Sequence, residues 1–263
     1  MTEQTPQEEP MQKDETGSEP RREPREPRDA AYWATYAETL KVTGVAEGAT
    51  NINVEGRRAV GPLQGFGKLW QKTYRVGLEG AEVTPTEVIK TWKENYQEFW
   101  PEGNRFYAPL AGIAPGEVAL ISGSMPGGVK LSTGVMVLYA DDESFSLMTP
   151  EGHPFSGWIT FSSFEEEGTT IAQAQVLMRA NDPLYEMGLR MGGHKMEDEL
   201  WQKTLTNLAT HFGVDEPVET NLVCVDPRLQ WSQYRNIWHN AGIRSALYMM
   251  TAPFRSRGKG SGR

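Results

Sequence analysis

The stretch that decides the fold runs from Asp182 to Phe212 and reads DPLYEMGLRMGGHKMEDELWQKTLTNLATHF. Asp182 is placed to cap the start of a helix, and Pro183 suits the first helical position, where a missing N–H costs nothing. Apolar side chains then recur at steps of three, four or seven, which puts them on one helical face. The stretch therefore predicts one long amphipathic helix with a large and partly aromatic face, made of Met187, Met191, His194, Trp201, Leu205, Leu208 and Phe212.

The residues before this helix carry the alternation that is typical of β-strands. In residues 66–78 the even positions are mostly apolar, so one side of a strand is predicted to be buried, although Lys68 and Lys72 interrupt that side. Five further runs follow, separated by short turns such as Met125–Gly128. Short strands joined by tight turns predict an antiparallel meander over residues 117–124, 129–140, 144–148, 155–164 and 169–179.

A second helix is predicted between the first strand and the meander. Residues 84–87, Thr-Pro-Thr-Glu, form a capping box with proline at the first helical position. Pro101 is expected to stop this helix, whose apolar side consists of Val88, Trp92, Tyr96 and Phe99.

The two ends of the chain lie outside this pattern. Residues 1–29 are acidic and proline-rich, with almost nothing apolar, and are predicted to be disordered. Residues 30–61 are predicted to be a short helix over 30–40 and an irregular linker. In residues 216–263 we expect a helical extension that starts near Asp226 and ends at Gly242, then a second apolar piece. A basic glycine-rich tail over residues 255–263 is predicted to be unfolded. The predicted domain is therefore 62–215.

Composition limits the classes of function. The formal charge of −9 argues against a general nucleic-acid binder, which needs a basic patch. A single cysteine, Cys224, excludes an intrachain disulfide and fits a reducing compartment. No apolar run approaches the roughly 18 residues of a membrane span, and the acidic N-terminus is unlike a signal peptide. We expect a cytoplasmic protein without an integral membrane segment.

The order of these elements resembles the helix-grip fold of the SRPBCC superfamily, which includes START-like lipid carriers, the birch-pollen allergen family and polyketide cyclases. The resemblance covers residues 62–215 and is one of order and pattern, without a diagnostic short motif. It rests on KLWQKTYRVGL (68–78), TPTEVIKTWKENYQEFWP (84–101), SFSLMTPEGHPFSGWITFS (144–162) and the stretch 182–212.

This resemblance implies an α+β domain in which a curved antiparallel sheet wraps around a long C-terminal helix, with a cavity between them for an apolar or amphipathic ligand. Methionine adapts to irregular shapes, and Trp and Tyr add a polar group to an apolar wall. The alternative for each such residue is an ordinary place in the core. The predicted ligand-binding set is Trp70, Tyr74, Trp92, Tyr96, Phe99, Met136, Trp158, Met178, Met187, Met191, His194 and Trp201.

His194 is the titratable residue of greatest interest. It lies beside Gly192-Gly193, a pair that weakens or bends a helix, and its ring could bind the polar end of a ligand or be satisfied by a backbone carbonyl. His194, Glu197 and Asp198 are spaced to approach one ion, but no paired His or Cys motif supports a metal, so no metal is predicted. Phosphate-binding motifs are absent, and no cofactor is predicted.

Three functions stay open at this stage. The first is a carrier or sensor for a small hydrophobic, lipid-like or polyketide-like ligand. The second is a cyclase or aromatase type of enzyme in which His194 or Tyr96 exchanges protons. No nucleophile–base–acid set can be assembled, and His153, in a proline-flanked turn, is assigned a structural role. The third is an interaction protein that acts through its Trp-rich C-terminal extension, with a homodimer as one form.

Overall fold

The computed structural model describes residues 29–124 and 130–257. The predictions of disorder before residue 29 and of a turn at Met125–Gly128 lie outside the described residues, as do residues 258–263 of the tail predicted to be unfolded. Residues 255–257 of that tail are helical, so the prediction is wrong for them. Among the described residues, no helix combines the length and the apolar character needed to traverse a bilayer.

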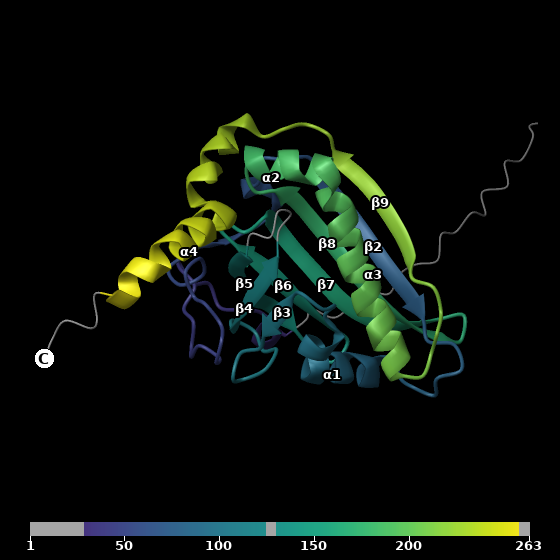
Figure 1. Cartoon of the computed structure of the whole chain (residues 1–263). Helices are drawn as coiled ribbons and strands as arrows, with labels where there is room; N and C mark the ends of the chain where they lie inside the picture. Colours follow the sequence, from purple (N-terminus) through teal and green to yellow (C-terminus); the bar gives the residue numbers. More distant parts are fainter. Residues whose placement is uncertain (1–28, 125–129, 258–263) are drawn as a thin grey trace, which may run out of the picture.

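The framework is one antiparallel sheet, with nine strands in the part of the chain that the structure describes (Figure 1). Neighbours follow the order β3-β4-β5-β6-β7-β8-β2-β9, and β1 pairs with β6. The run from β4 to β8 is the predicted meander, which is confirmed. The strands are β1 Ala59–Val60, β2 Leu69–Gly77, β3 Arg105–Tyr107, β4 Val118–Ser124, β5 Lys130–Ala140, β6 Ser144–Pro150, β7 Phe155–Glu166, β8 Thr169–Ala180 and β9 Glu219–Asp226.

The helices α1 (Pro85–Asn95) and α3 (His194–His211) cover the same face of this sheet. The predicted capping box holds, because Thr84 Oγ1 accepts from the Glu87 N–H and Glu87 Oε2 accepts from the Thr84 N–H. The sheet curves around α3, and the main core lies between them (Figure 1). The helical segments are η1 Ala30–Tyr32, η2 Pro62–Gln64, α1 Pro85–Asn95, η3 Tyr96–Phe99, α2 Pro183–Gly188, η4 Leu189–Gly193, α3 His194–His211, η5 Trp231–His239 and α4 Ala241–Arg257.

The period of two in β2 is also confirmed, with one correction. Tyr74 and Val76 are buried and pair across to Ala174 and Ala172 of β8, so these side chains share the face that meets α3. Lys72 does not interrupt this face. It is itself buried within it, with 1% of its surface exposed.

The prediction of one continuous helix from Asp182 to Phe212 is wrong. Asp182 does cap its start, accepting from the N–H groups of Leu184 and Tyr185. The helix then breaks at Gly192, whose φ of 113° is a left-handed value that glycine adopts without strain. The break sets the two pieces in different rotations, so the predicted face is not shared: Met187 and Met191 point to solvent, with Met191 80% exposed.

The flanks differ from their predicted secondary structure. Only Ala30–Tyr32 is helical in the first flank, and Trp33 then forms a bridge to Tyr139 of β5. Beyond residue 216 the first element is the strand β9, which hydrogen-bonds to the edge of β2. The helix expected from Asp226 begins later, as the 3₁₀-helix η5, and α4 starts where an end was expected. The β-branched residues of β9 favour an extended chain, which the helical prediction overlooked.

Candidate ligand cavity

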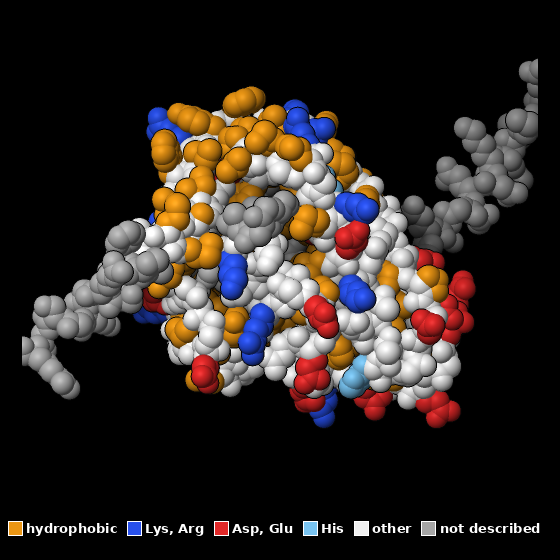
Figure 2. Space-filling view, viewed as in Figure 1, with side chains coloured by type: hydrophobic (Ala, Val, Ile, Leu, Met, Phe, Trp, Pro, Cys, Tyr) orange, Lys and Arg blue, Asp and Glu red, His pale blue; other side chains and the backbone are white. Residues whose placement is uncertain are grey.

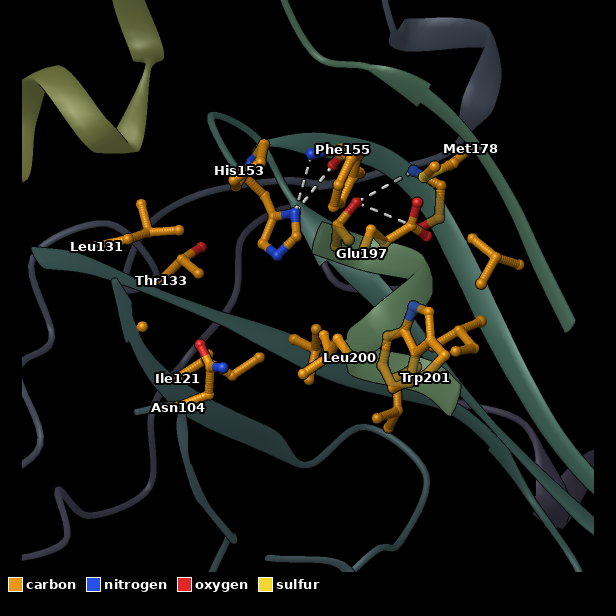
Figure 3. Close-up of a pocket in the computed structure, with 18 of the residues that line it drawn as sticks. Asn104, Ile121, Leu131, Thr133, His153, Phe155, Met178, Glu197, Leu200 and Trp201 are labelled. Atoms are coloured by element: carbon orange, nitrogen blue, oxygen red, sulfur yellow. Dashed lines mark hydrogen bonds between the residues drawn. The ribbon is translucent and has the colours of Figure 1, made fainter. Parts of the chain in front are cut away.

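A cavity of about 170 Å³ lies between the inner face of the sheet and α3. Figure 3 shows Glu197 and Trp201 of α3 on one side and Thr133 of β5 on the other. Alternate residues of neighbouring strands supply most of its wall, because side chains two apart share a sheet face. The lining residues are Tyr96, Trp100, Asn104, Ile121, Gly123, Ser124, Leu131, Thr133, Val135, Leu147, Thr149, His153, Pro154, Phe155, Gly157, Trp158, Ile159, Val176, Met178, Glu197, Leu200 and Trp201.

The structure brings together only part of the predicted ligand-binding set. Four of its members line the cavity: Tyr96, Trp158, Met178 and Trp201. Tyr74, Trp92 and Phe99 are fully buried in the packed core instead.

The remaining predicted residues lie away from the cavity. Met136 belongs to a second cluster, with Leu40 and Val118, because the inward side of β5 carries Val135 and leaves Met136 on the other. Met187 and Met191 are exposed by the break at Gly192. Trp70 and His194 pack against each other, with ring centres 5.0 Å apart, outside the cavity wall.

A buried ion cluster lies between β2 and α3, next to the cavity. Lys72 Nζ lies 2.6 Å from Glu197 Oε2 and 2.6 Å from Asp198 Oδ1. The Tyr74 hydroxyl donates to the same Asp198 oxygen over 2.7 Å, and burial raises the pKa of Tyr74, which keeps this proton in place. One lysine therefore forms ion pairs with two carboxylates, of which only Glu197 also lines the cavity.

Glu197 is the cavity residue whose pKa is moved to near neutral pH. Burial raises the pKa of Glu197 to about 7, and Asp198 adds to the rise, while Lys72 and the nearby Trp201 indole oppose it. Its Oε2 accepts from Lys72, but its Oε1 is buried and makes no hydrogen bond of ordinary geometry among the described residues, although the Trp201 indole lies near the carboxyl. At neutral pH this carboxyl can therefore either accept or donate a hydrogen bond inside the cavity.

Other polar atoms of the wall also lack a hydrogen bond of ordinary geometry. Buried polar groups in proteins are nearly always hydrogen-bonded, so a cluster of exceptions needs an explanation. In the described part of the chain, five such atoms of lining residues make no hydrogen bond of ordinary geometry: Tyr96 Oη, Trp100 Nε1, Thr133 Oγ1, Glu197 Oε1 and Trp201 Nε1. Trp100 nevertheless lies close enough to Tyr96, and Trp201 to Glu197, to lower the pKa of its neighbour. A ligand with its own polar group would satisfy some of them.

His153 borders the cavity from the turn between β6 and β7. Its Nδ1 lies 3.1 Å from the Phe155 amide nitrogen and 3.2 Å from the Phe155 carbonyl oxygen, so it accepts from the first or donates to the second, according to the tautomer. Burial lowers the pKa of His153 to about 4, which keeps the ring neutral at pH 7. These contacts with Phe155 are consistent with the structural role assigned to His153.

The residues weighed as a metal site are already occupied by protein contacts. The ammonium of Lys72 sits between Glu197 and Asp198, where a cation would have to lie. Burial, and then Lys72, lower the pKa of His194 to about 4. Within residues 29–124 and 130–257, no group of three His, Cys, Asp or Glu side chains is arranged to hold a metal ion.

A second hollow of about 510 Å³ adjoins the first and is more polar. The two share Asn104, Gly123, Ser124 and Leu131, at the end of the β4–β5 pair. The second hollow also carries Arg105 and Lys130. An elongated ligand could therefore place an apolar end in the cavity and a polar end outside.

Replacing Thr133 by valine is expected to leave the free energy of unfolding unchanged or to raise it by about 1 kcal/mol, because the lost hydroxyl is buried without a partner. Thr149→Val is the matched control. Thr149 lines the same cavity, but its hydroxyl accepts from the Gly157 N–H at 3.1 Å and lies 3.2 Å from the Gly157 carbonyl. Its loss should cost about 1–3 kcal/mol in urea denaturation. Equal losses in both variants would show that Thr133 has a partner.

Comparison with known proteins finds likeness in structure alone. No protein-family model matches the chain, and no curated protein matches its sequence. Protein Ms6760 from Mycobacterium smegmatis is 13% identical, and the match covers 54% of this chain and 90% of that one at a TM-score of 0.40. Ara h 8.0201 is 11% identical, and the match covers 55% of this chain and 97% of that one at a TM-score of 0.40. The di-domain ARO/CYC StfQ from the steffimycin biosynthetic pathway is 10% identical, and the match covers 55% of this chain and 50% of that one at a TM-score of 0.42.

The fold assignment follows from the chain's own topology. The meander β4–β8 continues into β2, and α3 packs on the inner face of the curved sheet. This is the arrangement that the resemblance to the SRPBCC superfamily implied, and the predicted fold class is confirmed. The chain is a helix-grip protein of the α+β class.

Proposed function

We propose that the chain binds a small apolar molecule with a hydroxyl or similar polar group, as a carrier or sensor. The proposal rests on one observation: polar atoms that make no hydrogen bond of ordinary geometry, including one oxygen of Glu197, line a mostly apolar cavity. A hydroxyl suits these atoms, because it can donate to Glu197 Oε1 and accept from an indole N–H. The ligand-binding domain is proposed to comprise residues 62–215, to which β9 adds an edge strand.

The volume favours a compact ligand in the inner cavity. A dry protein cavity of about 150 Å³ holds benzene, so about 170 Å³ suits one ring. Burial of roughly 150 Å² of a ring contributes about 4 kcal/mol, and a hydrogen bond to a charged group adds about 1.5–3 kcal/mol. A longer lipid-like or polyketide-like ligand would have to extend into the second hollow.

Phenol and toluene test this proposal, since they differ mainly in the hydroxyl. Phenol is expected to bind about tenfold more tightly than toluene, as measured by calorimetry and thermal shift. Val176→Phe should abolish binding of both, because Val176 is a buried lining residue and a phenyl ring would fill the space. Val223→Phe, on the exposed strand β9, is the control and should bind as the wild type does. Equal binding by both variants would place the ligand elsewhere.

The second candidate is an enzyme of the cyclase or aromatase type. The near-neutral pKa of Glu197 favours it, because a carboxyl with a pKa near 7 is suited to proton transfer in either direction. Of the residues predicted for this role, His194 lies outside the cavity and Tyr96 has a pKa raised by burial. Exchange of solvent deuterium into the α-carbon of a small cyclic ketone, lost in Glu197→Gln while binding persists, would support the enzyme; absence of exchange in the wild type counts against it.

A further inference from the structure

The end of the chain has a charge opposite to that of the rest. Residues 227–263, called here the C-terminal arm, contain seven basic residues and no acidic residue. The first 226 residues hold the other 19 basic and all 35 acidic residues, a net charge of −16. The basic residues of the arm are Arg228, Arg235, Arg244, Arg255, Arg257, Lys259 and Arg263.

The arm is fixed to the domain through its polar side. The Asn240 amide donates to Asp182 Oδ2 over 2.8 Å, and the Gly242 N–H donates to the Tyr185 hydroxyl over 2.9 Å. Ser245 is buried and accepts from the amide of Asn53 over 3.1 Å. Hydrogen bonds from the domain therefore hold one face of η5 and α4 in place.

The opposite side of the arm presents apolar side chains to solvent. Trp231 is 68% exposed and Trp238 78%. Figure 2 shows apolar side chains gathered over α2, η5 and α4, with Lys and Arg side chains among them and acidic side chains mostly at the other end of the molecule. This is the reverse of a usual surface helix, which turns its apolar face to the core. The exposed apolar set on this side of the arm is Trp231, Tyr234, Trp238, Ile243, Leu247 and Met250, whereas Met249 shares the helical face of Ser245 and lines the second hollow.

We propose that the C-terminal arm docks on an anionic membrane surface. Trp and Tyr prefer the level of the lipid headgroups, and a segment that combines exposed apolar residues with Lys and Arg binds such interfaces. Each basic residue near an anionic surface strengthens binding roughly fivefold. The rest of the chain, with its net negative charge, is repelled, so the attraction orients the molecule with the arm toward the lipid.

Two other occupants fit less well. A second copy in a two-fold dimer would place one basic arm against another, since such an interface uses the same patch on both subunits. Residues 1–28 offer little apolar surface to cover the arm, because they contain no aromatic or branched aliphatic residue.

Docking would bring the cavity rim close to the lipid. The Ala241 N–H donates to the Gly152 carbonyl over 2.8 Å, one residue before His153. Exchange of a ligand between cavity and bilayer would depend on the proposed function, whereas the docking itself does not.

Vesicle co-sedimentation of the full chain tests the docking. Phosphatidylcholine vesicles with about 30% phosphatidylserine should bind the protein at least tenfold more strongly than phosphatidylcholine alone, and added salt should remove the difference. Trp231→Ser combined with Trp238→Ser should weaken binding to the anionic vesicles at least tenfold. Tyr36→Ser combined with Leu110→Ser removes two exposed side chains elsewhere and should bind like the wild type.

Thermal unfolding of each variant shows that the fold is kept. The proposal would be overturned if the protein bound both vesicle types equally, or if the double variant Trp231→Ser, Trp238→Ser bound the anionic vesicles as strongly as the wild type does. The proposal would also be overturned if the protein bound no vesicles and sedimentation equilibrium showed a dimer that the double variant Trp231→Ser, Trp238→Ser dissociates. The exposed surface would then bind a second copy of the chain.

Discussion

Replacing Lys72 by methionine should lower the free energy of unfolding by about 3–5 kcal/mol, because removal of one partner leaves buried carboxyl groups uncompensated. Lys72 has 1% of its side chain exposed and contacts Glu197 and Asp198. Lys195→Met is the control on the same protein, since Lys195 forms an exposed pair with Glu199 over 3.7 Å. Such surface pairs contribute about 0–1 kcal/mol. Urea denaturation measures both, and similar losses would show that Lys72 is not effectively buried.

The pH dependence identifies the carboxyl responsible. The folded-state pKa of Glu197, about 7, is above its ordinary value of 4.5, so its contribution to stability is fully present below about pH 4.5 and is lost as pH rises toward 7. Without Lys72, which lowers this pKa, the loss continues to higher pH. The difference between wild type and Lys72→Met should therefore be larger at pH 8 than at pH 5. Glu197→Gln should remove this dependence, and a difference that stays constant with pH would exclude Glu197 as its source.

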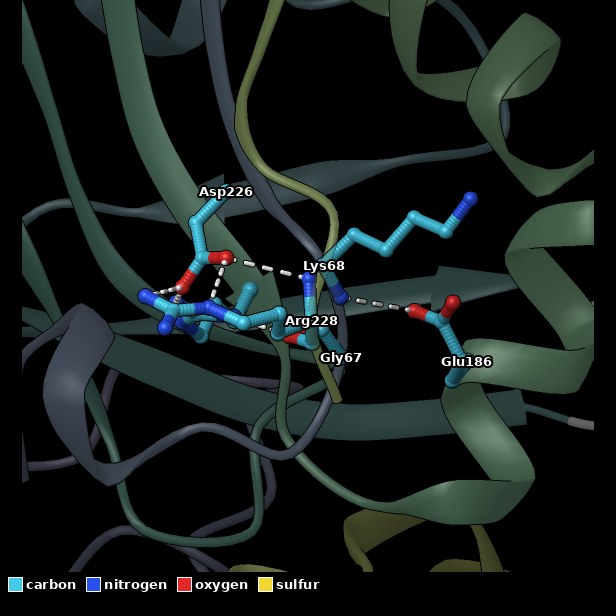
Figure 4. A network of polar contacts seen from close by, with 6 residues as sticks. Gly67, Lys68, Glu186, Asp226 and Arg228 are labelled. Carbon is cyan, nitrogen blue, oxygen red and sulfur yellow. Dashed lines mark hydrogen bonds and ion pairs between the residues drawn. The ribbon is translucent and has the colours of Figure 1, made fainter. Parts of the chain in front are cut away.

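Replacing Arg179 by methionine should cost about 3–5 kcal/mol as well, and should loosen β9 and the start of the C-terminal arm. Arg179 is buried, donates to the Gly67 carbonyl over 2.6 Å and to the Arg228 carbonyl over 2.9 Å, and pairs with Asp226 over 2.7 Å. Figure 4 shows the carboxylate of Asp226 facing the side chain of Arg228, near Gly67. Arg228, and then Arg179, hold the pKa of Asp226 well below its usual range.

Hydrogen exchange separates this anchoring from a general loss of stability. Amide protection should fall first in residues 219–231, ahead of the central strands. Arg75→Met is the control, because Arg75 pairs with Glu166 on the surface over 2.6 Å and should cost no more than about 1 kcal/mol. Uniform loss of protection in the Arg179 variant would argue against a local anchor.

The sheet could be predicted because alternation is a local signal. Each strand of the meander has apolar residues two apart and a turn at its end. The start of α1 could be predicted because the capping box is contained in four consecutive residues, Thr84–Glu87. The edge strand β9 lacks this signal: nearly all its side chains are exposed, and its place depends on pairing with β2, far away in the sequence.

The polar part of the site depends on contacts that local patterns do not show. Lys72 on an inward strand position was interpreted as an interruption of the buried face, because its carboxylate partners lie about 125 residues later. The glycines at 192–193 indicated a weak point, but not that Gly192 would take a positive φ and turn Met191 outward. A lysine on an inward strand position, with a Glu-Asp pair on the facing helix, is the signal that could have identified the cluster.

The break at Gly192 also places two sets of contacts on separate helices. Tyr185, which receives the arm, is on α2, whereas Glu197, which faces the cavity, is on α3. Because the two pieces do not share one helical register, a rotation of α2 about its axis does not oblige α3 to rotate with it. Substitutions that alter the attachment of the C-terminal arm at Tyr185 are therefore expected to leave the position of Glu197 in the cavity unchanged.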